Sequence, residues 1–112
     1  MKIRIDIKSI FGNVIFSFEK KNNTIKDTLE EANLKCANLR GADLKDANLR
    51  DANLAGADLK GANLRDADLG FSNLRGANLA GADLKDANLK CADLKGVDLG
   101  FSNLKYANLV GA

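Results

Sequence analysis

The sequence predicts an all-β solenoid, and three features of this chain of 112 residues support the prediction. Residues 32–111 read as sixteen consecutive five-residue units without an insertion. Leucine holds the third position of every unit, and Asn or Asp holds the second. Proline is absent from the chain, as expected where strands lie inside a stack and need their backbone N–H groups. We number the positions of a unit first to fifth, starting at Ala32.

A spacing of five residues fits neither a helix nor a flat strand. On an α-helix, residues five apart differ by about 140°, so the leucines would spread over every face. On a flat strand, an odd spacing would send successive leucines to opposite sides. The small first residue and the leucine lie two apart, so they share one side of an extended segment. The backbone must therefore turn a corner in every unit, and it winds into coils that pair as in a parallel sheet.

The leucine column is the predicted core and the main stabiliser. Each buried leucine contributes about 2 kcal/mol, which chain entropy largely offsets. The first position adds a small residue, alanine except at Ser72, Val97 and Ser102. The leucines of the column are Leu34, Leu39, Leu44, Leu49, Leu54, Leu59, Leu64, Leu69, Leu74, Leu79, Leu84, Leu89, Leu94, Leu99, Leu104 and Leu109.

The fifth position is the corner of each unit. Glycine occupies seven of the sixteen corners, where it would ease a tight turn. The other nine hold Asp, Cys, Phe or Tyr. We therefore expect that a positive φ angle is not required at every corner. The pattern alone leaves open how many corners complete one coil.

These tandem Ala-Asp/Asn-Leu-X-X units resemble the pentapeptide-repeat family over 80 of the 112 residues. The resemblance implies a right-handed, four-sided parallel β-helix with four units, or 20 residues, in each coil. The repeats would then form about four coils, stacked to about 19 Å at about 4.8 Å per coil. Their predicted bounds are 32–51, 52–71, 72–91 and 92–111.

Residues 1–31 lack the five-residue units, and we predict that they form an N-terminal cap for the β-helix over 32–112. Apolar and polar residues alternate along two segments, which predicts a β-hairpin over 2–20. A two-residue turn at Gly12 and Asn13 would pair residues whose numbers sum to 25, which sets Asp6 opposite Glu19. Thr24 is a suitable N-cap for a short helix over 25–31.

The sequence offers no candidate for a catalytic residue, a cofactor site or a metal site, so we predict that the protein is not an enzyme. Histidine, the commonest general base and metal ligand, is absent. Cys36 and Cys91 would lie about 13 Å apart along the coil axis, beyond the reach of a disulfide. Unpaired cysteines and the lack of an export signal favour the cytoplasm. No apolar run approaches the roughly 18 residues of a membrane span.

Coils of 20 residues would bring charged residues into columns. Lys45, Arg65, Lys85 and Lys105 form one column, and Asp46, Asp66, Asp86 and Tyr106 form its neighbour. Such columns could bind a polyion or a metal. We expect instead that each cation screens the adjacent acid, which gives a solvated surface with weak pairs.

These features predict a non-enzymatic structural or protein-interaction module with an unidentified protein partner. The family resemblance offers an alternative, a DNA-mimicking protein that binds or protects a type II topoisomerase such as gyrase. Mimicry needs a negative surface, whereas residues 32–112 carry eleven basic and ten acidic groups on a short rod. Alternating charges and few aromatic residues also disfavour direct nucleic-acid binding.

The last predicted coil exposes apolar residues where the first carries charged ones. Phe101, Tyr106 and Val110 are the residues concerned. Exposed apolar surface usually finds a partner, so the sequence predicts a homodimer through this C-terminal coil.

Overall fold

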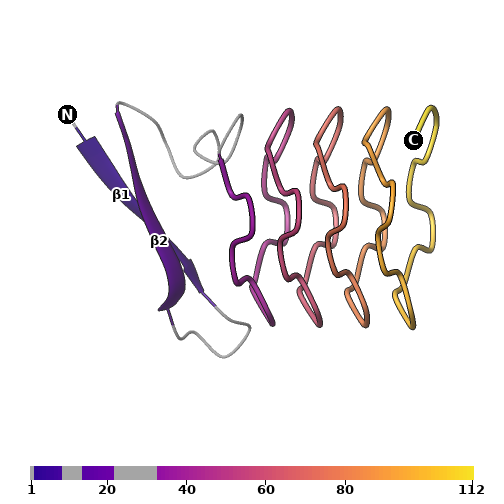
Figure 1. Cartoon of the computed structure of the whole chain (residues 1–112), viewed down its shortest axis with the longest axis horizontal. Helices are drawn as coiled ribbons and strands as arrows, with labels where there is room; N and C mark the ends of the chain where they lie inside the picture. Colours follow the sequence, from indigo (N-terminus) through magenta and orange to yellow (C-terminus); the bar gives the residue numbers. More distant parts are fainter. Residues whose placement is uncertain (1, 9–13, 22–32) are drawn as a thin grey trace.

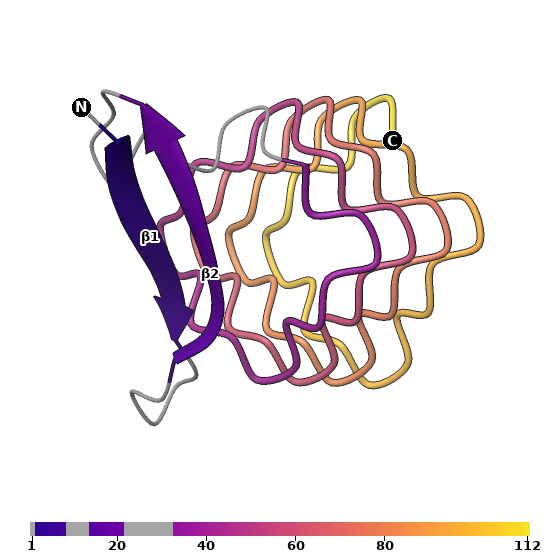
Figure 2. The ribbon, with the colours of Figure 1, turned by 60° about the vertical axis from the view of Figure 1, so that its left-hand side comes forward.

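The computed structural model describes residues 2–8, 14–21 and 33–112. Strands β1 (Lys2–Lys8) and β2 (Val14–Lys21) form an antiparallel two-stranded sheet. From residue 33 onward the chain winds through successive coils, and the hairpin lies at the end of the stack opposite the C-terminus (Figures 1 and 2). The repeats thus form one stack with a distinct element at its N-terminal end.

Successive coils pair in parallel at a separation of twenty residues. Bridges join the second position of each unit to the second position four units later, from Asn33–Asn53 to Asn88–Asn108. The N–H of Leu54 donates to the carbonyl of Asn73 at 2.7 Å, and the N–H of Asn73 donates to the carbonyl of Ala52 at 2.9 Å. Paired segments are short because a corner interrupts the chain every five residues.

All sixteen corners have a positive φ angle, between 57° and 72°. The expectation that some corners would not need this conformation is wrong. The first-position N–H that follows each corner donates to the preceding leucine carbonyl, as from Ala57 to Leu54 at 3.0 Å. This bond closes a β-turn whose third residue is the corner, the place where a type II turn needs positive φ. Asp, Cys, Phe and Tyr adopt it at a cost of about 1–2 kcal/mol each.

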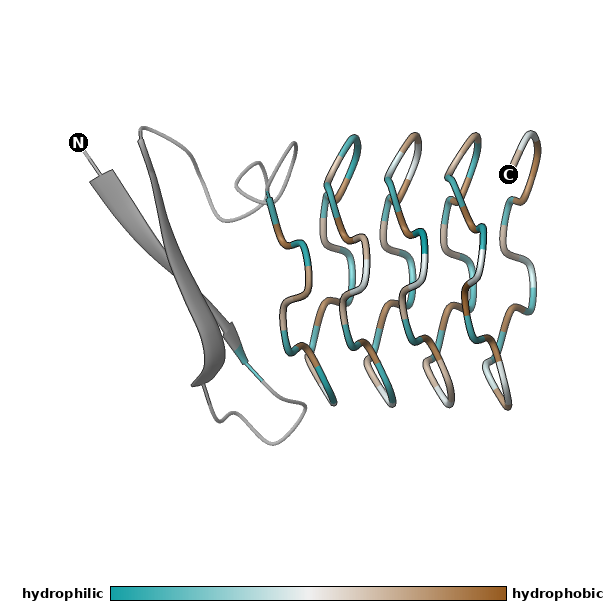
Figure 3. Ribbon diagram, in the orientation of Figure 1, coloured by the Kyte–Doolittle hydropathy of each residue, from teal (hydrophilic) through white to brown (hydrophobic). Residues whose placement is uncertain are grey.

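Leucine and alanine fill the inside of the stack. Every leucine of the column from Leu34 to Leu89 is at most 3% exposed, and the first-position alanines pack between them. Hydrophobic and hydrophilic segments alternate along each coil (Figure 3). In the last coil, Leu94, Leu99 and Leu104 are only partly buried, and Leu109 is 43% exposed.

The hairpin has a different register from the predicted one. Ile5 faces Phe18 and Ile7 faces Phe16, so paired numbers sum to 23, with an irregularity between Ile7 and Lys8. The predicted register, in which paired numbers sum to 25, is therefore wrong. The shift of two residues leaves the alternation between faces unchanged. In the observed register Glu19 is paired with Arg4 and no longer with Asp6.

Strand β1 contacts the first coil of the stack. The backbone N–H of Asp43 donates to the carbonyl of Lys8 at 2.6 Å, which joins β1 to the first coil. Leu34 and Leu39 in that coil are as buried as the leucines of the middle coils, although no coil precedes them. The predicted turn at 12–13 and the predicted helix over 25–31 lie outside the described residues.

Candidate interaction surface

The second-position Asn or Asp organises the outside of every unit. Its Oδ1 atom accepts a hydrogen bond from the backbone N–H two residues later, at 2.9–3.4 Å in all sixteen units. This is an Asx turn, for which only Asn and Asp have the required side chain. It satisfies the fourth-position N–H, which points to neither neighbouring coil. Sequence reasoning found the Asn/Asp column but not this role.

Four ion pairs connect neighbouring coils along the outside of the stack. In each, the Nη1 atom of a fourth-position arginine approaches Oδ2 of a second-position aspartate eighteen residues later. Side chains in these pairs are between about one third and just over one half exposed, so each pair contributes under about 1 kcal/mol. The pairs are Arg40–Asp58 at 3.5 Å, Arg50–Asp68 at 3.4 Å, Arg65–Asp83 at 3.2 Å and Arg75–Asp93 at 3.3 Å.

The sequence predicted that each cation would screen the acidic residue next to it in the chain. The observed ion pairs are different. Arg65 reaches Asp83 in the next coil instead of the adjacent Asp66. Within residues 33–112, no ion pair within 4.0 Å involves Asp46, Asp66 or Asp86. Spacings of 5 and 20 relate residues at the same position of their units. The partners in these ion pairs occupy different positions, so such spacings do not reveal them. A spacing of 18 does reveal them.

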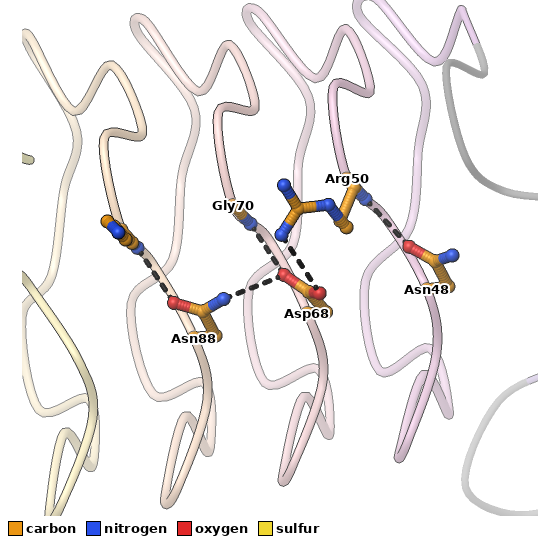
Figure 4. Close-up of polar contacts among 6 residues, drawn as sticks. Asn48, Arg50, Asp68, Gly70 and Asn88 are labelled. Carbon is orange, nitrogen blue, oxygen red and sulfur yellow. Dashed lines mark hydrogen bonds and ion pairs between the residues drawn. The ribbon is translucent and has the colours of Figure 1, made fainter.

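Arg50 is the most constrained of the four arginines. Its guanidinium lies 5.5 Å from the centroid of the Phe71 ring, in addition to its contact with Asp68. A Cβ atom at Gly70 would lie 3.0 Å from Nη1 of Arg50, so this fourth-position glycine leaves room for the guanidinium. Figure 4 shows Arg50 reaching along the stack toward Asp68 and Gly70.

The predicted C-terminal interface residues are all exposed. Phe101 is fully exposed, Tyr106 is 72% exposed and Val110 is 66% exposed. Phe101 and Tyr106 occupy successive corners, and Lys105 Nζ lies 5.1 Å from the centroid of the Tyr106 ring. An open recess of about 560 Å³ lies on the same coil, lined by residues 91–95, 111 and 112. The three predicted residues thus lie exposed in three successive units of the last coil.

The described residues include no site that resembles a metal centre. No group of three or more Cys, Asp or Glu side chains that could hold a metal ion occurs among them. Cys36 and Cys91 are exposed free thiols. In the same part of the chain, no helix has the length and apolar character needed to cross a membrane.

Comparison with solved structures finds other pentapeptide repeat proteins. Rfr23 from the cyanobacterium Cyanothece 51142 is 43% identical, with a TM-score of 0.68 over 69% of this chain and 52% of that chain. A protein from Nostoc PCC 7120 is 42% identical, with a TM-score of 0.41 over 61% of this chain and 60% of that chain. A protein from the Arabidopsis thaliana thylakoid lumen is 34% identical, with a TM-score of 0.41 over 72% and 60%.

This chain spans between about half and three fifths of the length of these proteins. No curated protein matches it. A family model described as pentapeptide repeats matches residues 28–61 and 62–100 with eight copies. These residues make up more than half of the chain and include most of the Ala-Asp/Asn-Leu-X-X units. The chain therefore belongs to the pentapeptide-repeat family, as the resemblance of its units predicted.

Proposed function

We propose that the protein is a non-enzymatic structural and protein-interaction module built on a right-handed, four-sided β-helix. The hairpin serves as its N-terminal cap, and the C-terminal coil serves as its contact surface. The observation that carries this proposal is the difference between the two ends of the stack. Leu39 in the first coil is fully buried, whereas Leu109 in the last coil is 43% exposed beside the exposed Val110.

The backbone of the last coil supports this assignment. In earlier coils the leucine and corner N–H groups donate to the following coil, as from Leu84 to Asn103 at 2.7 Å. Within residues 33–112, the corresponding N–H groups of Leu94 and Leu104 have no backbone acceptor. Such an edge accepts an added extended segment, and the apolar side chains beside it supply contact area.

A second copy of the chain is the partner that we propose for this surface. Because the leucines of the first coil are already buried, the two copies would meet through their C-terminal coils. Such a contact gives a symmetric dimer that leaves no further C-terminal coil open. The last coil carries Asp93 and Asp98 beside Lys95 and Lys105, so like ends do not repel strongly. The whole molecule extends 28 × 23 Å across its longest axis, which sets an upper bound on the end of the stack. Contact across that end would therefore bury at most on the order of 1,200 Å² in total, the lower limit for a stable interface.

Sedimentation equilibrium over a range of concentrations tests the dimer. We expect a dimer mass for the chain and a monomer mass for the variant Tyr106→Glu/Val110→Glu. The control is Phe71→Glu, which places one glutamate at an exposed aromatic residue of an earlier coil. A monomer mass for the unaltered chain at every concentration would contradict the dimer.

Mimicry of DNA is not supported by the arrangement of charges. Four of the acidic side chains are held by arginines of the preceding coil, so they do not form a continuous negative surface. A basic partner site needs such a surface. We therefore expect no effect of the protein on supercoiling by a type II topoisomerase. Inhibition or protection in that assay would favour the topoisomerase function and count against a purely structural module.

We also propose a cytoplasmic location. The exposed free thiols of Cys36 and Cys91 fit a reducing compartment. Thiol labelling in intact cells and in lysates, together with fractionation of the source cell, tests this location. Recovery of the protein outside the cytoplasm would contradict it.

A further inference from the structure

The type of cation in the fourth position of a unit is related to the second-position residue eighteen places later. Within residues 33–112 every arginine precedes an aspartate at this spacing, at the four ion pairs described above. Every lysine that has a counterpart precedes an asparagine. These combinations are Lys35 with Asn53, Lys45 with Asn63, Lys60 with Asn78, Lys85 with Asn103 and Lys90 with Asn108.

In two places the aspartate contacts the coil before it and the coil after it. Asp68 Oδ2 lies 3.4 Å from Arg50 Nη1, while Oδ1 accepts the N–H of Gly70 at 2.9 Å and Nδ2 of Asn88 at 3.0 Å (Figure 4). Oδ2 therefore contacts the preceding coil, and Oδ1 contacts its own coil and the following one. One carboxylate joins three successive coils.

The second place has the same arrangement on another side of the stack. Asp83 Oδ2 lies 3.2 Å from Arg65 Nη1. Asp83 Oδ1 accepts the N–H of Lys85 at 3.1 Å and Nδ2 of Asn103 at 3.3 Å. The same geometry therefore occurs on two sides of the stack.

Chemistry explains why aspartate lies beyond arginine. With Oδ1 engaged by the backbone, an asparagine would turn its Nδ2 donors toward the guanidinium, which has only donors. The guanidinium is weakly hydrated and holds its donors in a fixed planar fork, so it gains less than an ammonium by turning away into water. A lysine carries one compact ammonium on a flexible stem and can turn to water. Asparagine is therefore acceptable beyond lysine but not beyond arginine.

We propose that the triplets Arg50–Asp68–Asn88 and Arg65–Asp83–Asn103 lock successive coils together. The cation in the fourth position determines which residue is favoured in the second position eighteen residues later. Arginine favours aspartate there, and lysine favours asparagine. These locks lie along the sides of the stack, so the proposal is independent of the C-terminal contact surface and goes beyond the proposed function.

A variant set around Asp83 tests the lock. Asp83→Asn keeps the acceptor Oδ1 and changes only the group that faces Arg65. The matched control is Asp98→Asn, since Asp98 accepts the N–H of Gly100 at 2.9 Å but residue 80, eighteen places earlier, is alanine. We expect Asp83→Asn to raise the unfolding equilibrium constant in urea about two- to fivefold above the control. Equal effects of the two variants would overturn the proposal.

The double variant Arg65→Lys/Asp83→Asn separates the lock from a general effect of charge loss. It recreates the Lys–Asn combination found at Lys60 and Asn78, so we expect it to recover most of the loss caused by Asp83→Asn alone. Recovery should occur although the double variant has one acidic group fewer than the chain. A double variant as unstable as the sum of its single variants would overturn the proposal.

The reverse exchange tests the rule at Lys60, which forms no ion pair with the residues that the structure describes. We expect Lys60→Arg to raise the unfolding equilibrium constant, because it sets a guanidinium toward the amide of Asn78. Lys60→Arg/Asn78→Asp should then recover stability, with a gain that shrinks as salt screens the new pair. An arginine that costs nothing beside Asn78 would count against the rule.

Discussion

The thiol of Cys36 fills the space beside Gly56, the residue at the same corner of the next coil. A Cβ atom at Gly56 would lie 3.2 Å from the Cys36 Sγ atom. The same relationship recurs between Cys91 and Gly111, where the distance would be 3.0 Å. In both cases a glycine follows the cysteine along its column, so the two cysteines act as space-filling corner residues.

Gly56→Ala is therefore expected to destabilise the protein more than Gly61→Ala. Both glycines have φ near 67°, but nothing lies within 4 Å of a Cβ atom at Gly61. Positive φ alone costs about 1 kcal/mol for alanine. Contact with the exposed Cys36 adds less than about 1 kcal/mol, because its side chain can rotate. Urea unfolding measures the difference, and Cys36→Ala should abolish it. Equal costs of the two glycine variants would show that the thiol contact is unimportant.

Substitution of Ser72 and Ser102 by alanine should have opposite effects. Ser72 is 1% exposed, and its Oγ has no hydrogen-bond partner in the described part of the chain. Ser102 Oγ donates to the carbonyl of Leu99 at 2.8 Å. Ser72→Ala is expected to stabilise the protein by about 1 kcal/mol, and Ser102→Ala to destabilise it by about 0.5–1 kcal/mol. Thermal unfolding checks the signs, and a loss of stability in Ser72→Ala would show that its hydroxyl is satisfied.

The conformation of the corners predicts a preference for glycine at Asp86, where φ is 60°. Asp86→Gly should be about 1 kcal/mol more stable than Asp86→Ala, because glycine adopts positive φ without strain. At the neighbouring Lys85, whose φ is not positive, the order should reverse, since glycine only increases the entropy of the unfolded chain. Chemical denaturation of the four variants gives both differences. The same order at both residues would contradict the turn geometry.

Truncation of leucines should cost less in the last coil than in the middle of the stack. Leu64 is fully buried, whereas Leu109 is 43% exposed. Leu64→Ala is expected to cost about 2–5 kcal/mol through lost contact and a residual cavity. Leu109→Ala should cost under about 1.5 kcal/mol, because part of its surface already meets water. If Leu109→Ala cost as much as Leu64→Ala in a dilute sample, the last coil would have to be covered in solution.

The sequence predicted the inside of the stack better than its outside. The five-residue spacing places Leu64 and its equivalents inside, because only one side of each extended segment can face the core. The conformation of the corners was missed because residues such as Phe71 and Cys91 rarely adopt positive φ by preference. Here the turn bond from the next N–H to the preceding leucine carbonyl, which every corner has, imposes that conformation on whatever residue stands there.

The contacts between side chains were harder to predict, for a geometric reason. Arg50 and Asp68 occupy different positions of their units, so neither a spacing of 5 nor a spacing of 20 relates them. In the hairpin, alternation specified which residues share a face but not the register, since shifts of two residues preserve the alternation. The observed pairing of Ile7 with Phe16 therefore needed the structure.

The separation of twenty residues between paired segments has a mechanical consequence. The hydrogen bonds between coils run along the axis of the stack. Tension on the C-terminus therefore acts first on the bonds that hold the last coil, and then on those of the coil before it. We expect the chain to peel under an optical trap in equal steps, each of which frees twenty residues, or about 65–70 Å of extended polypeptide. The extension record would then count the turns of the stack directly.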